Sequence, residues 1–281
     1  MHKYTLPITV TISLFCLSGY AQHVDSVKKC YHIFNPVPGK EMRDMQTDRP
    51  DVTESAYTVD AGHFQYETDA IKLIRNKDGD LANSQIFYNL ANIKIGITNS
   101  TDLQLVVESF VTNKTKNTIT NSTLTSSGFG DLTLRLKQNF WGNNGGKTAL
   151  AIMPYINIPT SKFSDDKRID GGVIIPFALE LKNNWNLGAQ VEIDVVKNDE
   201  SKSYHGELLN SVTLGKELSD KFSAFVESYY TYNFKEKQVD AYANGGLVYS
   251  VSPNFKIDTG LNYGLTKSSD KVYFVGFSFR Y

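Results

Sequence analysis

From residue 62 to the end of the chain, apolar and polar side chains alternate one by one in segment after segment. The last segment shows the pattern clearly, since Tyr273, Val275 and Phe277 fall on one face while Gly276 and Ser278 fall on the other. A period of two residues is typical of a β-strand with one apolar and one polar face. Helical periodicity is hard to find after residue 60. The chain is therefore predicted to be all-β.

Twelve segments show this alternation, and together they cover most of the chain after residue 61. They lie at residues 62–75, 84–98, 103–113, 128–141, 147–159, 171–183, 185–198, 203–218, 221–234, 238–252, 254–266 and 272–281. Ordinary globular domains contain roughly 20–25% strand, so a content this high is unusual for them. A membrane barrel is the exception, because in lipid every backbone group must pair and a sheet achieves this only by closing.

The connections between these segments alternate between short turns and generally longer polar links. The short turns lie at residues 99–102, 142–146, 184, 219–220 and 253, and the longer links at residues 76–83, 114–127, 160–170, 199–202, 235–237 and 267–271. Outer-membrane barrels have short periplasmic turns and longer external loops. We therefore predict a transmembrane antiparallel up-and-down β-barrel of about 12 strands in the bacterial outer membrane.

The chemistry of the two faces indicates which one meets lipid. The apolar face is nearly all Leu, Val, Ile, Phe and Tyr, with aromatic residues near the strand ends, as in the lipid-facing band of a membrane barrel. The polar face carries charges that are predicted to line the lumen: Glu67, Asp69, Lys94, Glu108, Arg135, Lys137, Glu192, Asp194, Glu207, Glu227, Asp258 and Arg280. Acids outnumber bases on this face, which predicts a weak cation preference. The alternative is a soluble β-sandwich with a polar exterior.

The region before the barrel divides into two parts. Residues 1–21 have a short basic start, an apolar stretch and small residues before Gln22, as in a secretory signal peptide. Residues 22–61 are then a periplasmic N-terminal segment, and residues 62–281 are the barrel. The final residue, Tyr281, closes an alternating aromatic strand and resembles the signal read by barrel assembly machinery. The expected partners are outer-membrane lipid, that machinery and a small-molecule solute.

Composition excludes several other classes of protein. The 29 Lys and Arg residues balance 30 Asp and Glu residues, so no basic excess is available to bind nucleic acid. No apolar run long enough for a membrane helix follows residue 21. The 2 Cys residues cannot form a disulfide scaffold. No cofactor is expected, because the sequence holds no Gly-rich phosphate loop between a strand and a helix.

Three motifs resemble one bacterial family. Residues 47–55 read TDRPDVTES, residues 128–132 read GFGDL, and residues 158–160 read IPT. They are similar to motifs of the family named for the meta-cleavage pathway of phenol degradation, although Ser161 replaces the Gly that usually follows Pro-Thr. The resemblance implies an outer-membrane transporter-like barrel. It also implies uptake of hydrophobic or aromatic compounds, which the charged lumen does not itself favour.

The first motif allows a physical hypothesis. Asp48, Arg49, Asp51 and Glu54 are dense charges around Pro50, which biases the residue before it towards an extended shape. We expect this segment to enter the periplasmic mouth, pair with charges of the barrel and narrow the pore. The alternative is a solvated linker.

The sequence predicts neither a catalytic site nor a metal site. His205 shares a face with Glu207 and Ser211, but residues two apart on a strand lie nearly 7 Å apart, which is too far for contact between short side chains. His23, Cys30 and His32 match no standard zinc spacing. We therefore predict a non-enzymatic channel or transporter for passive passage of small molecules. The alternatives are a closed structural or adhesive barrel and a lipid-modifying enzyme of the outer membrane.

Overall fold

The computed structural model describes residues 30–281 except 164–165 and 199–200, so the predicted signal peptide lies outside the described residues. The strands are β1 (Phe64–Asp78), β2 (Leu81–Thr98), β3 (Thr101–Asn117), β4 (Thr123–Gly128), β5 (Leu132–Trp141), β6 (Thr148–Ile158), β7 (Asp170–Glu180), β8 (Trp185–Lys197), β9 (Tyr204–Glu217), β10 (Phe222–Asn233), β11 (Gln238–Ser252), β12 (Phe255–Gly264) and β13 (Lys271–Arg280). No helix in this part of the chain is long and apolar enough to cross a membrane.

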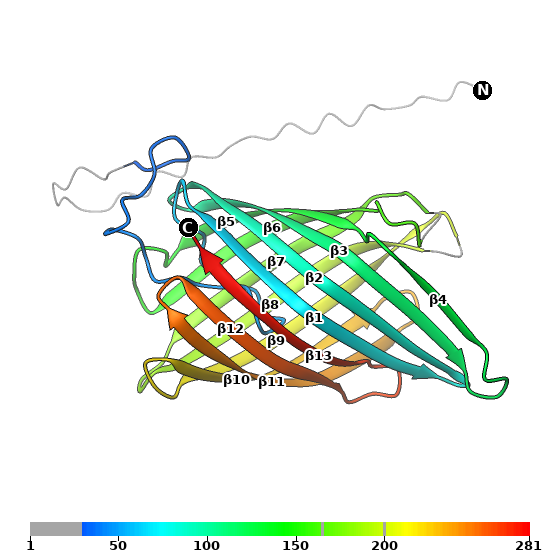
Figure 1. Cartoon of the computed structure of the whole chain (residues 1–281). Coiled ribbons are helices and arrows are strands. Elements are labelled where there is room, and N and C mark those ends of the chain that lie inside the picture. The colour runs from blue at the N-terminus through cyan, green and yellow to red at the C-terminus, as the bar shows by residue number, and fades with distance from the viewer. Residues whose placement is uncertain (1–29, 164–165, 199–200) are drawn as a thin grey trace, which may run out of the picture.

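In the described part of the chain, twelve of these strands close into one antiparallel barrel (Figure 1). Each strand pairs with its neighbours in sequence, and β1 pairs with β13 to close the ring. The short strand β4 continues the line of β5, and both pair with β3. Closure leaves the twelve strands of the ring without a free edge, as backbone hydrogen bonding in lipid requires. The predicted all-β, 12-stranded barrel is therefore confirmed.

The two faces of the barrel differ as the alternation predicts. On β8, Val191, Ile193 and Val195 are 41–56% exposed on the outer face, whereas Gln190 is 3% exposed on the inner face. The inner face is not uniformly polar, since Phe225 and Phe274 are buried in one apolar cluster. The outer band provides the apolar surface that lipid would cover.

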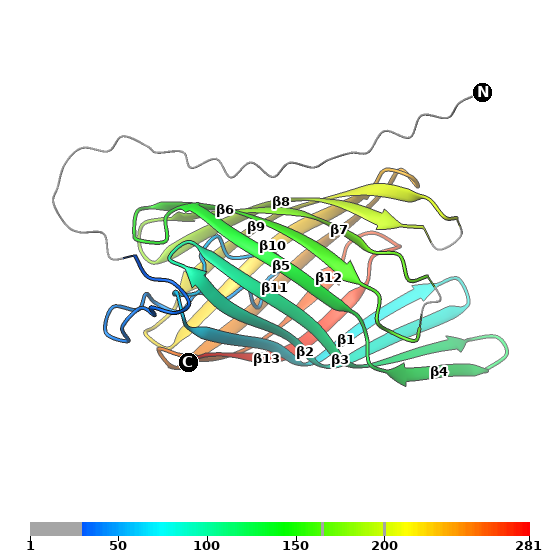
Figure 2. The same cartoon turned by 90° about the horizontal axis from the view of Figure 1, so that it is seen from above.

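Two of the predicted long links are wrong. The link at residues 76–83 is a two-residue turn, because β1 and β2 continue pairing to Asp78 and Leu81. The link at residues 114–127 is mostly hairpin, because β3 runs to Asn117 and pairs with β4. Both hairpins project past their neighbours at one end of the barrel (Figure 2). Strands that extend beyond lipid have two wet faces, so pairing there continues without the alternation that the prediction relied on.

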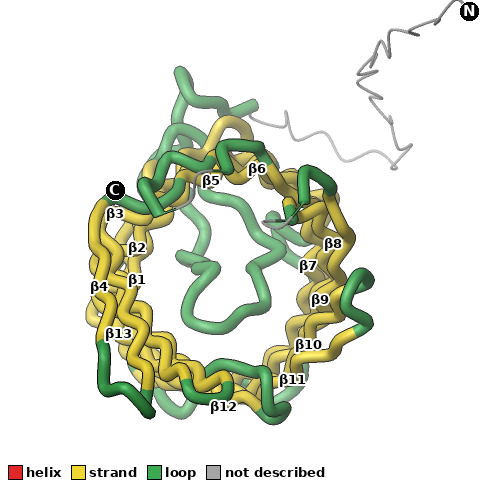
Figure 3. The backbone as a smooth tube through the Cα atoms, turned by 90° about the vertical axis from the view of Figure 1, so that its right-hand side faces the viewer, coloured by secondary structure: helices red, strands yellow, loops and turns green. Residues whose placement is uncertain are grey.

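The chain enters the barrel at the opposite end, which carries the turns at residues 99–100, 142–147, 181–184, 218–221 and 253–254. We call this the terminal end. There the backbone of Ile33 bonds to Ile97, and the backbone of Phe64 bonds to Tyr281. Viewed along the axis, the loop between these points lies inside the ring of strands (Figure 3). The N-terminal segment, residues 30–63, thus partly fills the lumen.

Candidate functional site

The candidate site is the part of the N-terminal segment that carries the predicted charged motif. Residues 48–54, which we call the crossing loop, make side-chain and backbone contacts with the inner face of the barrel. The Arg49–Pro50 peptide bond within it is cis. Its charged residues lie among the inward charges that the sequence predicts for the lumen.

Asp48 lies at the centre of a buried ion cluster. The Nζ atom of Lys137 on β5 donates to Asp48 Oδ1 at 2.5 Å, and Lys94 on β2 contacts both Asp48 and Glu67. The Asp48 backbone N–H donates to Glu67 Oε2 at 2.9 Å. Lys137 and Glu67 are each 0% exposed. Charges this deeply buried are tolerated only when paired and hydrogen-bonded, and here every member has an ionic partner.

Arg49 connects the crossing loop to two further strands. Its Nη1 atom lies 2.6 Å from Asp69 Oδ1 on β1, and its Nη2 atom lies 2.6 Å from Asp258 Oδ1 on β12. Its guanidinium carbon lies 5.7 Å from the centre of the Phe274 ring. A guanidinium suits this position because its planar fork serves two carboxylates at once while stacking on an aromatic face.

The far side of the crossing loop contacts strands on the opposite side of the lumen. Glu227 on β10 accepts the backbone N–H groups of Val52 and Thr53 at 2.9 and 2.7 Å. The hydroxyls of Thr53 and Ser211 on β9 lie 2.7 Å apart. Glu54 completes this side through two contacts. Its N–H donates to Gln190 on β8 at 2.7 Å, and its carboxylate accepts from Arg135 on β5 at 2.7 Å.

Within seven residues, the crossing loop thus contacts β1, β2, β5, β8, β9, β10 and β12. These are seven of the twelve strands of the barrel. Loop and barrel are complementary in charge on one side and in hydrogen-bonding groups on the other. The loop therefore spans the lumen, and it is held by many contacts at once.

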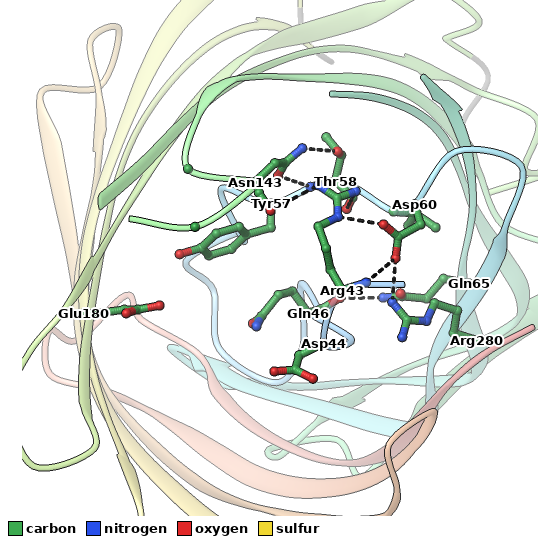
Figure 4. A pocket seen from close by; sticks show the side chains of 13 residues that line it. Arg43, Asp44, Gln46, Tyr57, Thr58, Asp60, Gln65, Asn143, Glu180 and Arg280 are labelled. Atoms are coloured by element: carbon green, nitrogen blue, oxygen red, sulfur yellow. Dashed lines mark hydrogen bonds and ion pairs between the residues drawn. The ribbon is translucent and has the colours of Figure 1, made fainter. Parts of the chain in front are cut away.

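A second cluster fastens the N-terminal segment nearer the terminal end, and of its residues only Arg280 was predicted to face the lumen. Asp60 accepts from Arg43 Nε at 2.7 Å and from Arg280 Nη1 at 3.1 Å (Figure 4). The amide of Asn143 donates to Thr58 Oγ1 at 2.6 Å. These residues line a cavity of about 140 Å³. Arg43 and Asp60 belong to no motif, and Arg43 stands among other charged residues, so only the isolated charge of Asp60 could have marked this cluster.

The remaining predicted lumen residues lie away from the crossing loop. Tyr155 donates to Glu192 at 3.2 Å and to Asp194 at 2.6 Å. Glu108 accepts the Asp131 N–H at 3.0 Å, where β4 gives way to β5. These acids are therefore bound by neutral donors, as Glu227 is, whereas Glu67, Asp69 and Asp258 face cations.

The expectation that His205 and Glu207 do not touch is wrong. His205 Nε2 lies 2.9 Å from Glu207 Oε1, because both side chains are long enough to bridge the strand spacing. Asn233 donates to the same Glu207 oxygen at 2.7 Å. Ser211, the third member of the rejected catalytic set, instead contacts Thr53 of the crossing loop.

Burial in the lumen and neighbouring charges shift the pKa values of the three acidic residues of the crossing loop. Burial raises the pKa of Asp48, but the ammonium groups of Lys137 and Lys94 outweigh it and hold that pKa well below its ordinary value. Burial and the nearby Asp48 charge raise the pKa of Glu54 to about 7 against the opposing effect of Arg135. Burial and the Glu227 carboxylate raise the pKa of Asp51 to about 8. The loop thus holds one strongly ionised acid and two that titrate near neutrality.

The described residues contain no group of three or more His, Cys, Asp or Glu side chains placed to hold a metal ion. Cys30 is exposed and unpaired with another cysteine. The site is thus an array of ion pairs and hydrogen bonds between a loop and a barrel.

Fold and site together define an outer-membrane-type β-barrel with an occupied lumen. The NanC porin is similar, with a TM-score of 0.50 at 9% identity, covering 76% of this chain and 98% of that one. The KdgM porin gives 0.48 at 10% identity, covering 77% and 98%. The transport unit of the autotransporter AIDA-I from Escherichia coli gives 0.48 at 11% identity, covering 84% and 92%. Comparison with curated protein sequences gave no match.

The family is shown by the sequence itself. Residues 47–281 match the family described as "Putative MetA-pathway of phenol degradation". The chain belongs to this family, as the TDRPD motif and the two Gly and Pro-Thr motifs predicted. The match begins at Thr47, one residue before the crossing loop, so the loop and the barrel are parts of one family pattern.

Proposed function

We propose that this protein is an outer-membrane channel for passive passage of small molecules, closed by the crossing loop and opened when that loop leaves its place. The observation that carries the proposal is that one seven-residue loop contacts seven strands around the lumen. A loop fastened on all sides obstructs the barrel, whereas a solvated linker would make few such contacts.

Several features support this assignment. The apolar outer band suits lipid, and the protein NanC, which shares the fold, is a porin by its printed title. We place the protein in the outer membrane with the terminal end towards the periplasm, following the convention that barrel termini face that side. Tyr281, 90% exposed beside the first strand, is then available to the assembly machinery. No catalytic role is proposed, because Ser211 and His205 serve separate contacts.

The charges of the crossing loop indicate which class of solute the channel would pass. Hydrophobic or aromatic compounds remain the implication of the family name, and the residues around the loop supply ionic groups in place of a continuous apolar path. We therefore propose small polar or charged solutes as the main cargo.

A disulfide between loop and barrel tests the gating directly. The hydroxyls of Thr53 and Ser211 lie 2.7 Å apart, so Thr53→Cys with Ser211→Cys places two thiols within bonding range. In a background without native cysteines, single-channel conductance in planar bilayers is measured before and after reduction. We expect few openings in the oxidised form and recovered openings in the reduced form, with either single variant insensitive to reductant.

The same conductance measurement distinguishes the gated channel from a closed structural barrel. A closed structural barrel is favoured by the buried ion cluster, which stabilises the docked loop. For that rival, the reduced variant and the wild-type protein stay silent and liposomes containing them do not swell. Equal conductance in oxidised and reduced forms would show that solutes pass beside a fixed loop.

A further inference from the structure

A cavity of about 800 Å³ lies between the crossing loop and the turns of the terminal end, on the side of β7 to β11. Its ceiling includes Asp51 and Thr213, and its sides include Tyr57, Glu180 and Phe225. A volume of this size is typical of sites for small organic molecules.

The acid at the ceiling of the cavity has no cationic partner. Among the described residues, the other charges of the crossing loop, Asp48, Arg49 and Glu54, all have an ionic partner, whereas no cation pairs with Asp51. Asp51 lies beside Thr213 and the Glu227 carboxylate. The Thr213 side chain is only 9% exposed, and its hydroxyl lies beside the Asp51 carboxyl. An acid without a cationic partner and a buried hydroxyl are therefore neighbours at this side of the cavity.

Aromatic rings border the same cavity. Tyr57 extends towards Glu180, as Figure 4 shows from the neighbouring cluster. Phe225 faces inward, since the next residue, Val226, is 61% exposed on the outer surface. Carboxylates combined with aromatic faces recognise organic ammonium ions, because the ring quadrupole attracts a cation that a carboxylate also neutralises.

The basic residues that border the cavity mostly have other partners. Arg49 is bound by Asp69 and Asp258, and Lys256 donates to the Met45 carbonyl at 2.7 Å. Lys216 turns to the Asn183 carbonyl and the Trp185 ring. Lys221 lies in a turn at the rim beside Asp220. Among the described residues, no cation is therefore paired with Asp51 or Glu180.

We propose that this cavity is a binding site for a small organic ammonium ion, held by Asp51 and Glu180 with its carbon groups against Tyr57 and Phe225. The inference deepens the proposed function, on which it rests, by naming cations with an apolar body as the solutes that pause beneath the crossing loop. Thr213 would accept a hydrogen bond where the ion carries an N–H or O–H group.

Binding is tested on the full mature protein in detergent, with the crossing loop in place. The probes are choline and its uncharged isostere 3,3-dimethylbutan-1-ol, titrated by isothermal calorimetry at about pH 8, where about half of Asp51 is ionised and docking of the loop is only partly weakened. We expect choline to bind and the isostere to bind at least about tenfold more weakly. Asp51→Asn should weaken choline binding by about tenfold, and Tyr57→Leu should weaken it to a similar degree.

Asp80→Asn, in the β1–β2 turn at the other end of the barrel, is the matched control and should bind choline normally. Retained heat-modifiable migration on gels shows that each variant is folded. Equal binding of the two probes, or undiminished binding by folded Asp51→Asn, would overturn the proposal. Because this readout needs no ion current, it is independent of the disulfide experiment, and either idea can fail alone.

Discussion

At the scale of single residues, the buried ion cluster governs how firmly the crossing loop is held. Lys137→Met keeps the length of the side chain but removes its charge, leaving Asp48 with Lys94 as its only ammonium partner. Removing one member of a buried pair costs about 3–5 kcal/mol, here from docking of the loop. We expect hydrogen exchange of backbone amides in residues 43–57 to accelerate in this variant.

The control for this prediction is Lys77→Met, which removes an exposed charge near the β1–β2 turn. Its exchange pattern in the loop should match that of the wild-type protein. Unchanged exchange in Lys137→Met would mean that the cluster is not what holds the loop.

The acidity of the loop predicts a pH dependence of docking. Asp51 and Glu54 have raised pKa values of about 8 and about 7 when docked, because burial and neighbouring carboxylates disfavour their ionised forms. A released loop in water would lose those protons at much lower pH, so docking is most favourable in acid and weakens as pH rises through 7 to 8. We expect loop exchange, corrected for its intrinsic pH dependence, to accelerate from about pH 6 to about pH 9.

Asp51→Asn removes one of the two titrating groups and should flatten this dependence. The opposite trend, with the loop released on acidification, would contradict the assignment. In that case the paired Asp48 would dominate, since its lowered pKa stabilises docking at higher pH.

At the scale of elements, the alternation decides which face of each strand meets lipid. Ile193 is 56% exposed on the outer face of β8, next in sequence to the inward Asp194. Ile193→Arg should destabilise the barrel in bilayers by about 2–4 kcal/mol, the cost of a cation near the midplane. Denaturant unfolding in phospholipid vesicles, followed by tryptophan fluorescence, measures this change.

Glu180→Arg is the matched control, because that site lies on the inner face in the cavity at the terminal end. It should change unfolding far less than Ile193→Arg. Equal losses in the two variants would mean that the outer face is not covered by lipid.

The strands were predictable wherever they separate lipid from water. The ends of β7 to β13 match the predicted segments closely because one apolar face runs their full length. The projecting ends of β1 to β4 have no such contrast and were taken for loops. Which side chains of β1 and β2 point inward could not be predicted along their full length either. The alternation changes face at a register shift between Asp69 and Ile71 and at Asn89, whose φ is 55°.

At the scale of the whole molecule, the sequence located the candidate site but not its partners. The dense charge of residues 47–55 marked the loop. The alternation along the strands showed which charged side chains of the barrel point into the lumen and can pair with the loop. Which charge meets which depends on closure of the ring, since Arg49 and Asp258 are 209 residues apart in sequence. Arg43 and Asp60 were missed because Arg43 stands among other charges of the N-terminal segment and Asp60 stands alone, and neither position indicates their pairing with each other or with Arg280.

The charge of the N-terminal segment also sets the balance of the lumen as a whole. Residues 30–57 contain three basic residues, Lys40, Arg43 and Arg49, and five acidic residues, Glu41, Asp44, Asp48, Asp51 and Glu54. Deleting them removes a net charge of −2 and leaves Lys137 and Arg135 without the acids that neutralise them. We therefore expect the truncated barrel to conduct more but to be less selective for cations than the intact protein in its open state.

Reversal potentials in a salt gradient measure this shift, with folding verified by heat-modifiable migration. Adding Arg135→Gln and Lys137→Gln to the truncated barrel should move the reversal potential back towards cations, because the same two charges cause the change. Greater cation selectivity after deletion would contradict this prediction. It would mean that the bases neutralised by the loop do not affect the permeating ions, and that these ions instead pass along the acids of β8 and β9, which are Glu192, Asp194 and Glu207. The selectivity of this barrel would then belong to its strands alone.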